Sequence, residues 1–543
     1  MKILLIQPPI QDFYDTDIRL QPLGLCMLKA VVRERLPEVD VVVKDYHQGH
    51  GKRDIPMPHE LAYLKEYYAY RDKGPFSTFH GYSHFGASFD VIAREVWREN
   101  PDLIGISSLF SPYHREASAC AREIKKLLNS PVVMGGSHVS AMPVAVLEDP
   151  NVDFVVCGEG ERPFVEFVTA LLSGSSFEKV PGLGFKRNGK PILNAPQRNF
   201  TFEDLPPPDF SDLPPERYRL GKKPLCFITT TRGCPHRCEF CSVHLTFKEG
   251  FRQRRPAEVM SEIEKRYAAG YRVFDFEDDN LSFHKGNFKE LLSLIGQRWP
   301  AGEIRCTAMN GISYLSLDEE ILSLMKQAGF RDLNLSLVSA EEQSLAAAKR
   351  PHTVRKFMET VEQAHSLGFQ IVAYQIVGLP YETREMMVMT MVSLTRLPLL
   401  LGVSIFYMTP GSPISGKLVS LNDTDPFKAR STAMAIETDK FCRDELYTLF
   451  ITARIINFLK GLKIGEGAVS LKHALEFAGI QGKRARTGAE LLKRLLDENK
   501  LYAATARGHL PLSRFRPDLF SELFEKAEFI RTNEGGTIRL SGS

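Results

Sequence analysis

The chain of 543 residues has almost no excess of charge: 69 Lys and Arg residues face 66 Asp and Glu residues, and the formal net charge is +3. A nucleic-acid partner usually demands a strongly basic surface, so no nucleic acid is expected. Cysteine is scarce and odd in number, at nine residues, which is typical of cytosolic usage and argues against a framework of disulfides. Any clustered thiols are therefore free to bind metal.

Long hydrophobic runs are missing as well. The apolar start, residues 1–10, is broken by Pro8 and Pro9 and has no small-residue cleavage site behind it, so it predicts a buried strand and no signal peptide. The most apolar later run, residues 397–408, falls short of the roughly 20 residues that a membrane-spanning helix needs. We therefore expect a cytoplasmic protein with no membrane span. The chain also has no internal repeat and no low-complexity tract.

The length and the pattern of the chain predict several domains. Single cores stop growing at roughly 250 to 300 residues, so this chain implies two or three of them. In residues 1–175, short β-branched runs such as KILLIQ and VDVVVKDY alternate with helical stretches such as LGLCMLKAVVRERL. Such alternation predicts an α/β domain with a Rossmann-like, open parallel sheet that helices cover on both faces. Residues 48–89 interrupt it and are predicted to be an insertion, with some helix near HELAYLKEYYAYRD.

Three further parts follow. Residues 176–223 predict a linker, with a hairpin that turns at Asn188-Gly189 and a proline-rich crossing segment. Residues 224–417 contain six more strand-like runs separated by helices. This pattern favours a partial (β/α)6 barrel with polar groups collected at the carboxyl ends of its strands. In residues 418–543 the strand signal fades, and a helical C-terminal region is expected.

Three of the cysteines lie close together in CPHRCEFC, at Cys234, Cys238 and Cys241, directly after the strand-like run LCFITTTRG. Three thiolates at this spacing can converge on one metal centre from a single loop. A structural zinc site needs four ligands, and His244 or Cys226 could supply the fourth. Structural zinc usually organises a small module that lacks a core of its own, whereas this group of cysteines sits at the expected mouth of a barrel.

A 4Fe-4S cluster is the alternative. It contains four irons and normally takes four cysteines, so three protein ligands leave one iron open. An open iron at a barrel mouth can coordinate a substrate or a cofactor directly. The coordination position left open by the missing fourth thiolate is then the place where the reaction occurs.

The motif Cys-x-x-x-Cys-x-x-Cys, with the aromatic Phe240 before its last cysteine, resembles the signature of the radical S-adenosylmethionine (SAM) enzymes, and residues 224 to about 413 are similar to that family's core. The resemblance implies that Cys234, Cys238 and Cys241 hold three irons, while SAM, which Phe240 contacts, chelates the fourth. Reduction of this oxygen-sensitive cluster then splits SAM and yields a 5'-deoxyadenosyl radical. That radical abstracts hydrogen from an unactivated C–H bond, and the protein supplies orientation and a dry cavity.

Acidic residues follow the second strand of the expected barrel. In FEDDN, Glu277, Asp278 and Asp279 lie where the family holds the methionine amino group of SAM, so the resemblance assigns this contact to them. Carboxylates suit an ammonium group electrostatically. A helix N-terminus rich in Asp and Asn is the alternative interpretation.

Two later segments complete the SAM site that the resemblance implies. Ser336 and Ser339 fall where the family contacts the ribose, but Val338 stands where relatives often place a glutamate. VGLPYET resembles the segment that passes the adenine, with Val377 and Gly378 at that point, and glycine permits a close backbone approach. A Gly-x-Pro sequence is equally an ordinary turn at the end of a strand.

In the first domain the informative pieces are loops after strands. A nucleotide-like tail inserted along a parallel sheet needs small residues where it passes and a hydroxyl to hold it. Residues 1 to about 175 resemble the cobalamin-binding domain that precedes many radical SAM cores. The resemblance assigns cobalamin contacts to three segments: Ser107, Ser108 and Leu109; Gly135 and Gly136; and Gly158, Glu159 and Gly160. Glu159 and Glu161 also suit the first turn of the helix that follows them.

One part of that domain's pattern is absent from the sequence. Domains that ligate cobalt do so with a histidine in an Asp-x-His-x-x-Gly motif after the first strand, where this chain has QPPIQDFYD. A near match, DYHQGHG at residues 45–51, follows the second strand. Cobalamin can bind without a protein histidine on cobalt, or the pocket can be vestigial. The insertion and its approach carry histidines that can line the interdomain cleft or lie at the surface: His47, His50, His80 and His84.

Together these features predict a cobalamin-dependent radical SAM methyltransferase that acts on an unactivated carbon. One SAM would methylate cobalamin, a second would generate the radical, and the substrate radical would take the methyl group from cobalt. One alternative is a radical SAM enzyme without methyl transfer, for oxidative cyclisation or carbon–carbon coupling, whose cobalamin domain is vestigial. Another is a non-catalytic metal-binding or electron-transfer protein, although an electron carrier should saturate its cluster with four protein ligands. The enzyme implies an external one-electron reductant of the flavodoxin or ferredoxin type and a small-molecule, natural-product or lipid substrate.

Overall fold

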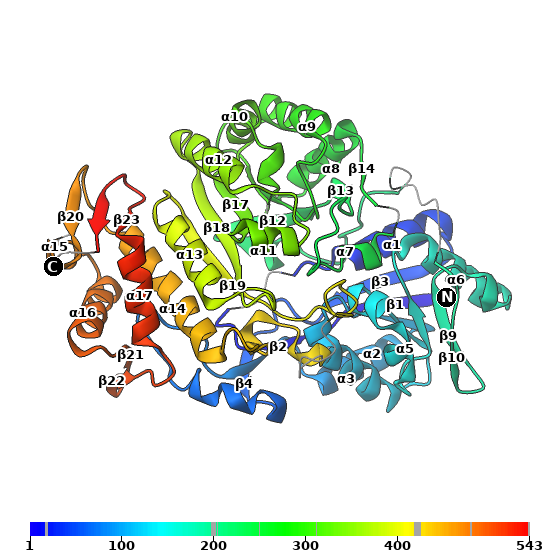
Figure 1. The fold of residues 1–543 in the computed structure, drawn as a ribbon. Coiled ribbons are helices and arrows are strands. Elements are labelled where there is room, and N and C mark those ends of the chain that lie inside the picture. The colour runs from blue at the N-terminus through cyan, green and yellow to red at the C-terminus, as the bar shows by residue number, and fades with distance from the viewer. Residues whose placement is uncertain are drawn as a thin grey trace.

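Parallel strands build the first part of the chain (Figure 1). The structure is a computed structural model that describes residues 1–16, 20–196, 202, 205–248, 250–310, 312–417, 425–477 and 480–540. Within these residues the first sheet has seven strands in the order β10-β9-β8-β7-β6-β1-β3, and five of them are parallel. The strands are β1 (Lys2–Gln7), β3 (Asp40–Asp45), β6 (Leu103–Ser107), β7 (Val132–Gly135), β8 (Phe154–Val156), β9 (Leu183–Arg187) and β10 (Lys190–Leu193). The predicted parallel sheet is confirmed.

Helices cover both faces of this sheet, as predicted. Successive side chains of a strand point to opposite faces, so the apolar run in β1 is buried in both directions. Ile3 and Leu5 pack with α1 and α6, whereas Leu4 and Ile6 pack with α2 and α3. The helices of this part are α1 (Leu23–Arg35), α2 (Phe89–Glu99), α3 (His114–Lys125), α4 (Ser137–Ala141), α5 (Pro143–Glu148) and α6 (Glu161–Ser173).

The insertion predicted at residues 48–89 forms a small antiparallel sheet with the segment after β1. The strands of this sheet, in the order β2-β5-β4, are β2 (Ile10–Asp12), β5 (Tyr82–Phe85) and β4 (Lys52–Ile55). The helix expected near residues 59–72 is a 3-10 helix, η1 (His59–Glu66). Tyrosines in and directly after this helix donate hydrogen bonds to the C-terminal region: Tyr63 to the carbonyl of Ala433, Tyr67 to the carboxylate of Asp444, and Tyr68 to the carbonyl of Thr432. Tertiary contacts of this kind override helix propensity.

The segment predicted as a linker, residues 176–223, begins with the expected hairpin. β9 and β10 turn at Asn188 and Gly189, whose φ angles of 51° and 75° are the left-handed values that a two-residue turn requires. The hairpin is not separate from the first domain, because β9 pairs antiparallel with β8 and so extends the first sheet. The chain then crosses to the barrel, and an ion pair between Lys29 of α1 and Asp212 holds the crossing segment.

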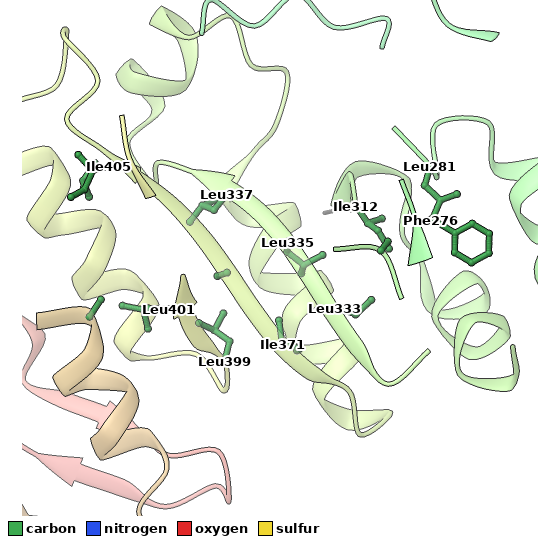
Figure 2. Packing of buried hydrophobic residues seen from close by; sticks show 14 of the residues in the cluster. Phe276, Leu281, Ile312, Leu333, Leu335, Leu337, Ile371, Leu399, Leu401 and Ile405 are labelled. Atoms are coloured by element: carbon green, nitrogen blue, oxygen red, sulfur yellow. The ribbon is translucent and has the colours of Figure 1, made fainter. Parts of the chain in front are cut away.

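Parallel strands also form the partial barrel expected for residues 224–417. β12, β15 and β16 pair with one another, β17, β18 and β19 pair in a second group, and a parallel bridge between Ile312 and Leu335 joins the two. The strands are β12 (Lys223–Ile228), β15 (Val273–Phe276), β16 (Arg305–Thr307), β17 (Asp332–Val338), β18 (Gln370–Val377) and β19 (Leu400–Ile405), and β11 (Arg219–Leu220) pairs antiparallel with β12. In the barrel core, Leu333 and Leu335 of β17 lie beside Ile371 of β18 (Figure 2).

Helices follow the barrel strands and cover them on the outside. They are α8 (Pro256–Ala268), α9 (Lys285–Arg298), α10 (Glu319–Gln327), α11 (Glu342–Ala347), α12 (Val354–Ser366) and α13 (Arg384–Thr395). Local sequence signals define where several of these helices begin. The side chain of Asp318 accepts a hydrogen bond from the backbone N–H of Ile321 at 3.0 Å and so caps α10, and Pro256 occupies the first turn of α8, where no backbone donor is needed.

The C-terminal region, predicted as helical over residues 418–543, is mostly helical and also carries short strands. Residues 418–424, at its predicted start, lie outside the described residues. The elements are α14 (Arg443–Lys460), β20 (Ala468–Ser470), α15 (Leu471–Phe477), α16 (Lys483–Glu498), β21 (Tyr502–Thr505), β22 (Gly508–Pro511), α17 (Pro517–Ala527), β23 (Phe529–Arg531) and β24 (Thr537–Arg539). α14 packs against β19 and α17 against α13, so the region covers one side of the barrel (Figure 1). Among the described residues, none of the helices combines the length and the apolar character that crossing a membrane requires.

Lys460, at the end of α14, ties the C-terminal region to the barrel. Its side chain is fully buried, and the ammonium group donates hydrogen bonds to the carbonyl oxygens of Thr395, Leu397 and Arg531 at 3.0, 2.6 and 3.2 Å. Thr395 ends α13 and Arg531 ends β23. Burial lowers the pKa of Lys460 to about 7. The three carbonyl oxygens offset part of this penalty on the charged form.

Replacing this anchor should loosen the C-terminal region. Lys460→Met leaves three buried carbonyl oxygens without a donor, and each loss costs about 1 kcal/mol or more, so the variant should be less stable by about 3 kcal/mol. The measurement is the thermal unfolding midpoint followed by circular dichroism. Lys463→Met, at an exposed position, is the matched control and should change stability by less than about 0.5 kcal/mol. Equal midpoints for the two variants would contradict the anchoring role.

Candidate functional site

The three cysteines predicted to hold a cluster lie in one loop beyond the carboxyl end of β12. We call residues 233–251 the cysteine loop. Its base is a two-stranded antiparallel ribbon of β13 (Thr231–Arg232) and β14 (Arg252–Gln253), and the short helix α7 (Val243–Thr246) lies within the loop. Gly233 has a φ of 75°, and a Cβ at this position would come within 2.2 Å of the carbonyl oxygen of Gly250. Because only glycine fits there, the two ends of the loop can meet.

The thiols of the cysteine loop are enclosed by protein. Cys238 is buried, and Cys234 and Cys241 are partly buried. Burial, together with the neighbouring thiols, raises the pKa of Cys234 and raises the pKa of Cys241 to about 11. Such thiols ionise on binding a metal, because the cation offsets the burial of their charge. Donors are in place for the thiolates: Asn280 Nδ2 lies 3.6 Å from Cys234 Sγ, and Arg350 Nη1 lies 3.9 Å from Cys238 Sγ.

The cysteine loop offers three thiols, and the structure does not bring Cys226 to them as a fourth ligand. Among the described residues, no group of three or more Cys, His, Asp or Glu side chains gathers around one point where a metal ion could sit. Zinc would draw its sulfur ligands to about 2.3 Å from a common centre, whereas the cysteines of a 4Fe-4S cluster bind different irons. Cys226, which could have been a fourth zinc ligand, is fully buried in β12, and its thiol contacts the carbonyl of Phe227 at 3.4 Å. The donor set therefore fits the cluster.

The acidic segment after β15 divides into two groups. Glu277 and Asp279 line a cavity at the barrel mouth, and Asp279 accepts a hydrogen bond from the backbone N–H that begins the cysteine loop, at 3.0 Å. Asp278 does not line the cavity. One of its oxygens accepts hydrogen bonds from the backbone N–H and hydroxyl groups of Thr230 and Thr231, and burial raises its pKa to about 6. Asp278 therefore anchors the start of β13, whereas Glu277 and Asp279 line the cavity, and their contact with the amino group of SAM stays a prediction.

The two serines predicted to contact the ribose take different positions. β17 has a bulge between Ser336 and Val338, and Val338 has a φ of 72°, a strained value for a β-branched residue. The carbonyl of Ser336 accepts a hydrogen bond from Arg350 at 2.8 Å. Ser339 is fully buried, and its hydroxyl lies 3.2 Å from that of Thr390. Ser339 thus faces internal packing, and only Ser336 remains near the cysteine loop.

The turn predicted to pass the adenine also packs internally. Val377 is fully buried, and Gly378 has a φ of 87°. A Cβ on Gly378 would lie 3.1 Å from the side chain of Leu446 in α14, so the close approach that this glycine permits is to the C-terminal region. Phe240 packs against the apolar cluster around Val338. The contacts of these residues with SAM stay predictions.

Arg350 and His352 are site residues that the sequence patterns miss. His352 is buried, and burial together with the neighbouring Arg350 lowers its pKa to about 3, so the ring is neutral. It packs against His236 of the cysteine loop, with 5.8 Å between ring centroids, and against Tyr314 at 4.7 Å. The only sequence signal is the segment KRPH between α11 and α12, which has no spacing that would link it to the distant cysteines.

A cavity of about 530 Å³ lies between the first domain and the barrel. Loops after β1, β6, β7 and β8 line one side, and the ends of β12 and β15 line the other. β1 has β3 on one side and β6 on the other, and open α/β sheets bind their ligands at such a switch point, beyond the carboxyl ends of the strands. Leu109, Phe110 and Met309 line the cavity and remain 36%, 46% and 37% exposed. Large apolar side chains left uncovered in a cavity suit a bulky, partly apolar ligand.

Most of the residues predicted to contact cobalamin line this cavity. They are Ser107, Leu109, Gly135, Gly136, Gly158, Glu159 and Gly160. Ser108 is the exception, because it is buried and its carbonyl lies against Gly136. Gly136 has a φ of 123°, and a Cβ there would come within 2.5 Å of that carbonyl oxygen, so glycine is required. The histidines considered for the interdomain cleft are not among the lining residues: His47, His50, His80 and His84.

Two arginines at the base of the cysteine loop pair with glutamates of the first domain. Arg232 donates from Nη1 to Glu159 at 3.0 Å and from Nη2 to Glu161, and Arg252 donates to the second oxygen of Glu159. Burial alone would lower the pKa of Arg232, but the carboxylates of Glu161 and Glu159 raise it. Glu161 also begins α6, where the helix dipole favours a negative charge. This network holds the cysteine loop on the first domain.

Comparisons with protein families match two separate parts of the chain. Residues 228–394 match the Radical SAM superfamily, and residues 82–168 match the B12 binding domain. The first match falls in the barrel, and the second spans the end of the insertion and three of the seven strands of the first sheet, β6, β7 and β8. The cavity therefore lies between the two matched regions.

The chain is also similar to individual proteins that are named methyltransferases. The chain is similar to an uncharacterised methyltransferase of Pyrococcus horikoshii, with 29% identity over 71% of this chain and 76% of that protein. The cytidylyl-2-hydroxyethylphosphonate methyltransferase of Streptomyces wedmorensis is 24% identical over 70% of this chain and 73% of its own length. The radical SAM methyltransferase TsrM from Kitasatospora setae, solved with cobalamin and a 4Fe-4S cluster bound, has the same fold, with a TM-score of 0.58, 20% identity, and coverage of 77% of this chain and 74% of TsrM.

Removing the three thiols should remove the metal. When Cys234, Cys238 and Cys241 are replaced together by alanine, the anaerobically reconstituted protein should contain almost no iron or sulfide, because the barrel mouth then offers no thiolate. Iron and sulfide assays and the visible absorbance measure this. Cys226→Ala is the control and should keep its iron. A triple variant that retains iron, or bound zinc that depends on Cys226, would rule out the assignment.

Adding a side chain at Gly136, in the loop after β7, should weaken corrinoid binding. Gly136→Ala places a methyl group against the Ser108 carbonyl and shifts the loop that lines the cavity, so the dissociation constant for hydroxocobalamin should rise about tenfold, which corresponds to about 1.4 kcal/mol. Gly174→Ala is the matched control, because Gly174 also has a positive φ, 65°, but open space around its Cβ position. Absorbance titrations compare the two, and equal affinities would show that the loop does not contact the ligand.

Proposed function

We propose that this chain, which belongs to the radical SAM superfamily and carries a B12 binding domain ahead of its radical SAM domain, is a cobalamin-dependent methyltransferase that acts on an unactivated carbon. One observation carries this proposal: a single cavity is lined both by the glycine loops of the first domain and by the carboxylates beside the cysteine loop. Two cofactors held at its opposite sides would share one space. The two relatives that cover about 70% of the chain are both named methyltransferases.

Each part of the cavity has a role in this proposal. Cys234, Cys238 and Cys241 hold the cluster, and Glu277 and Asp279 receive the amino group of SAM. The glycine loops after β7 and β8 let the corrinoid pass close to the backbone. When bound, the reduced cluster supplies a 5'-deoxyadenosyl radical from SAM, and the corrinoid supplies the methyl carrier.

The chain's own side chains keep such a site dry. Leu109 and Phe110 face the cavity from the first domain, and Met309 faces it from the barrel side. Apolar walls exclude water, which would otherwise compete for a reactive intermediate. Arg350, close to Cys238, adds a positive charge beside thiolates that become negative when they bind iron.

The reaction also implies partners outside the chain. An external one-electron reductant of the flavodoxin or ferredoxin type would reduce the cluster, and the substrate would be a small molecule, a natural product or a lipid. All nine cysteines are free thiols, which suits a reducing compartment such as the cytoplasm.

Labelled SAM tests the proposal. Under anaerobic conditions and with dithionite as reductant, the reconstituted protein should convert SAM to 5'-deoxyadenosine. With SAM that carries carbon-13 in its methyl group, mass spectrometry should find the label in a product other than methionine, and only when cobalamin is present. Cleavage of SAM in which the label stays in the released methionine, in protein that retains its corrinoid, would instead favour radical chemistry without methyl transfer. Protein that neither cleaves SAM nor binds iron would refute the radical SAM assignment itself.

A further inference from the structure

The base of the cysteine loop is held by charges of the first domain. β13 and β14 place Arg232 directly opposite Arg252, and the two guanidinium groups take the two oxygens of Glu159. Arg232 reaches Glu161 as well. A guanidinium group that bonds to two carboxylates at once has a fixed, planar geometry. The segment 158–161 that follows β8 therefore holds the loop base from the first domain, in addition to Asp278 and Asp279, which hold it from the barrel.

These charges are buried, so their pairing matters. The side chains of Arg232, Glu159 and Glu161 are 10%, 9% and 7% exposed, and the ring of Phe202 lies 4.4 Å from the Arg232 guanidinium. Breaking a buried pair leaves a charge without compensation, which is far more unfavourable than losing a pair at the surface. A displacement of the cysteine loop relative to the segment 158–161 would therefore break these buried ion pairs, so the two segments are expected to move as one.

The same residues line the cavity. Arg232, Glu159 and Glu161 are all part of its wall, and Gly158 and Gly160 stand on either side of Glu159. A second contact reinforces the link. In α7 of the cysteine loop, the hydroxyl of Thr246 lies 3.2 Å from that of Ser137, and a Cβ on Gly158 would be 3.6 Å from the Thr246 carbonyl. A ligand that orders the glycine loops of the first domain thus acts on the loop that carries the cysteines.

We propose that Arg232 is a positioning residue that couples the two cofactor sites. A corrinoid bound along the glycine loops favours the position of Glu159 and Glu161 that holds the cysteine loop for the cluster, and the cluster favours corrinoid binding by the same factor, because such coupling is reciprocal. This inference rests on the proposed function for the identity of the two ligands. It adds that the first domain strengthens cluster binding as well as holding a cofactor of its own.

Titrations in four states test the coupling. The dissociation constant for hydroxocobalamin is measured by absorbance in protein with and without its reconstituted cluster, for the wild type and for Arg232→Gln. In the wild type the cluster should tighten corrinoid binding about fivefold or more, the usual lower range of a coupling between sites. In Arg232→Gln the ratio of the two constants should fall to about one. If Arg232 had only a structural role, its replacement would raise both dissociation constants by the same factor and leave their ratio unchanged.

Further variants guard this test. Arg255→Gln is the matched control, because Arg255 is close to the ribbon but is 72% exposed and pairs with Glu258, and this variant should keep the wild-type ratio. If Arg232→Gln does not fold, Glu161→Gln removes one pair while keeping the shape of the side chain, and it should lower the ratio as well. In protein without cofactors, hydrogen exchange of residues 158–161 should be faster in Arg232→Gln than in the wild type.

The outcomes separate this inference from the proposed function. Wild-type protein that binds the corrinoid equally well with and without its cluster, or a folded Arg232→Gln variant that keeps the wild-type ratio, would overturn the coupling and leave the cofactor assignment intact. Wild-type protein that binds no corrinoid in either state would overturn both.

Discussion

Four buried charges, those of Arg232, Arg252, Glu159 and Glu161, determine where the cysteine loop rests. The barrel strand β12 leads into the loop, and Asp278 and Asp279 of the barrel hold its start, whereas the carboxylates that pair with the arginines of its base belong to the first domain. Removing one partner of a buried pair costs about 3–5 kcal/mol, which is a large part of the stability of an ordinary domain. The mouth of this barrel is therefore completed by a neighbouring domain, and the two cannot be understood separately.

The cavity has the same composite origin. The first sheet opens a crevice where β1 lies between β3 and β6, and the barrel closes that crevice with the ends of β12 and β15. Its walls combine glycine loops, which allow the backbone to approach a ligand, with large apolar side chains such as Leu109 and Met309, which exclude water. Acidic groups line both sides of this space: Glu159 and Glu161 of the first domain pair with the arginines at the base of the cysteine loop, and Glu277 and Asp279 lie on the barrel side.

The sequence predicts the strands, the hairpin and the cysteine loop well, because apolar periodicity, turn residues and ligand spacing are local signals. It predicts less well which way a side chain faces. Asp278 and Ser339 stand in the right segments, yet both turn into internal hydrogen bonds, since neighbouring residues on a strand point in opposite directions. Arg232 carries no signal at all in the sequence, because its partner Glu161 lies 71 residues away and only the folded chain brings them together.

The tyrosines of the insertion lead to a different conclusion. Tyr63, Tyr67 and Tyr68 donate hydrogen bonds to the C-terminal region, although 364 to 377 residues separate the partners along the chain. Each of these segments therefore supplies hydrogen-bond partners that the other needs in the folded protein. A change in the C-terminal region that removes these hydrogen-bond acceptors would leave the tyrosines of the insertion without partners. In related proteins, sequence changes in the two segments should therefore occur together, while the barrel strands between them stay the same.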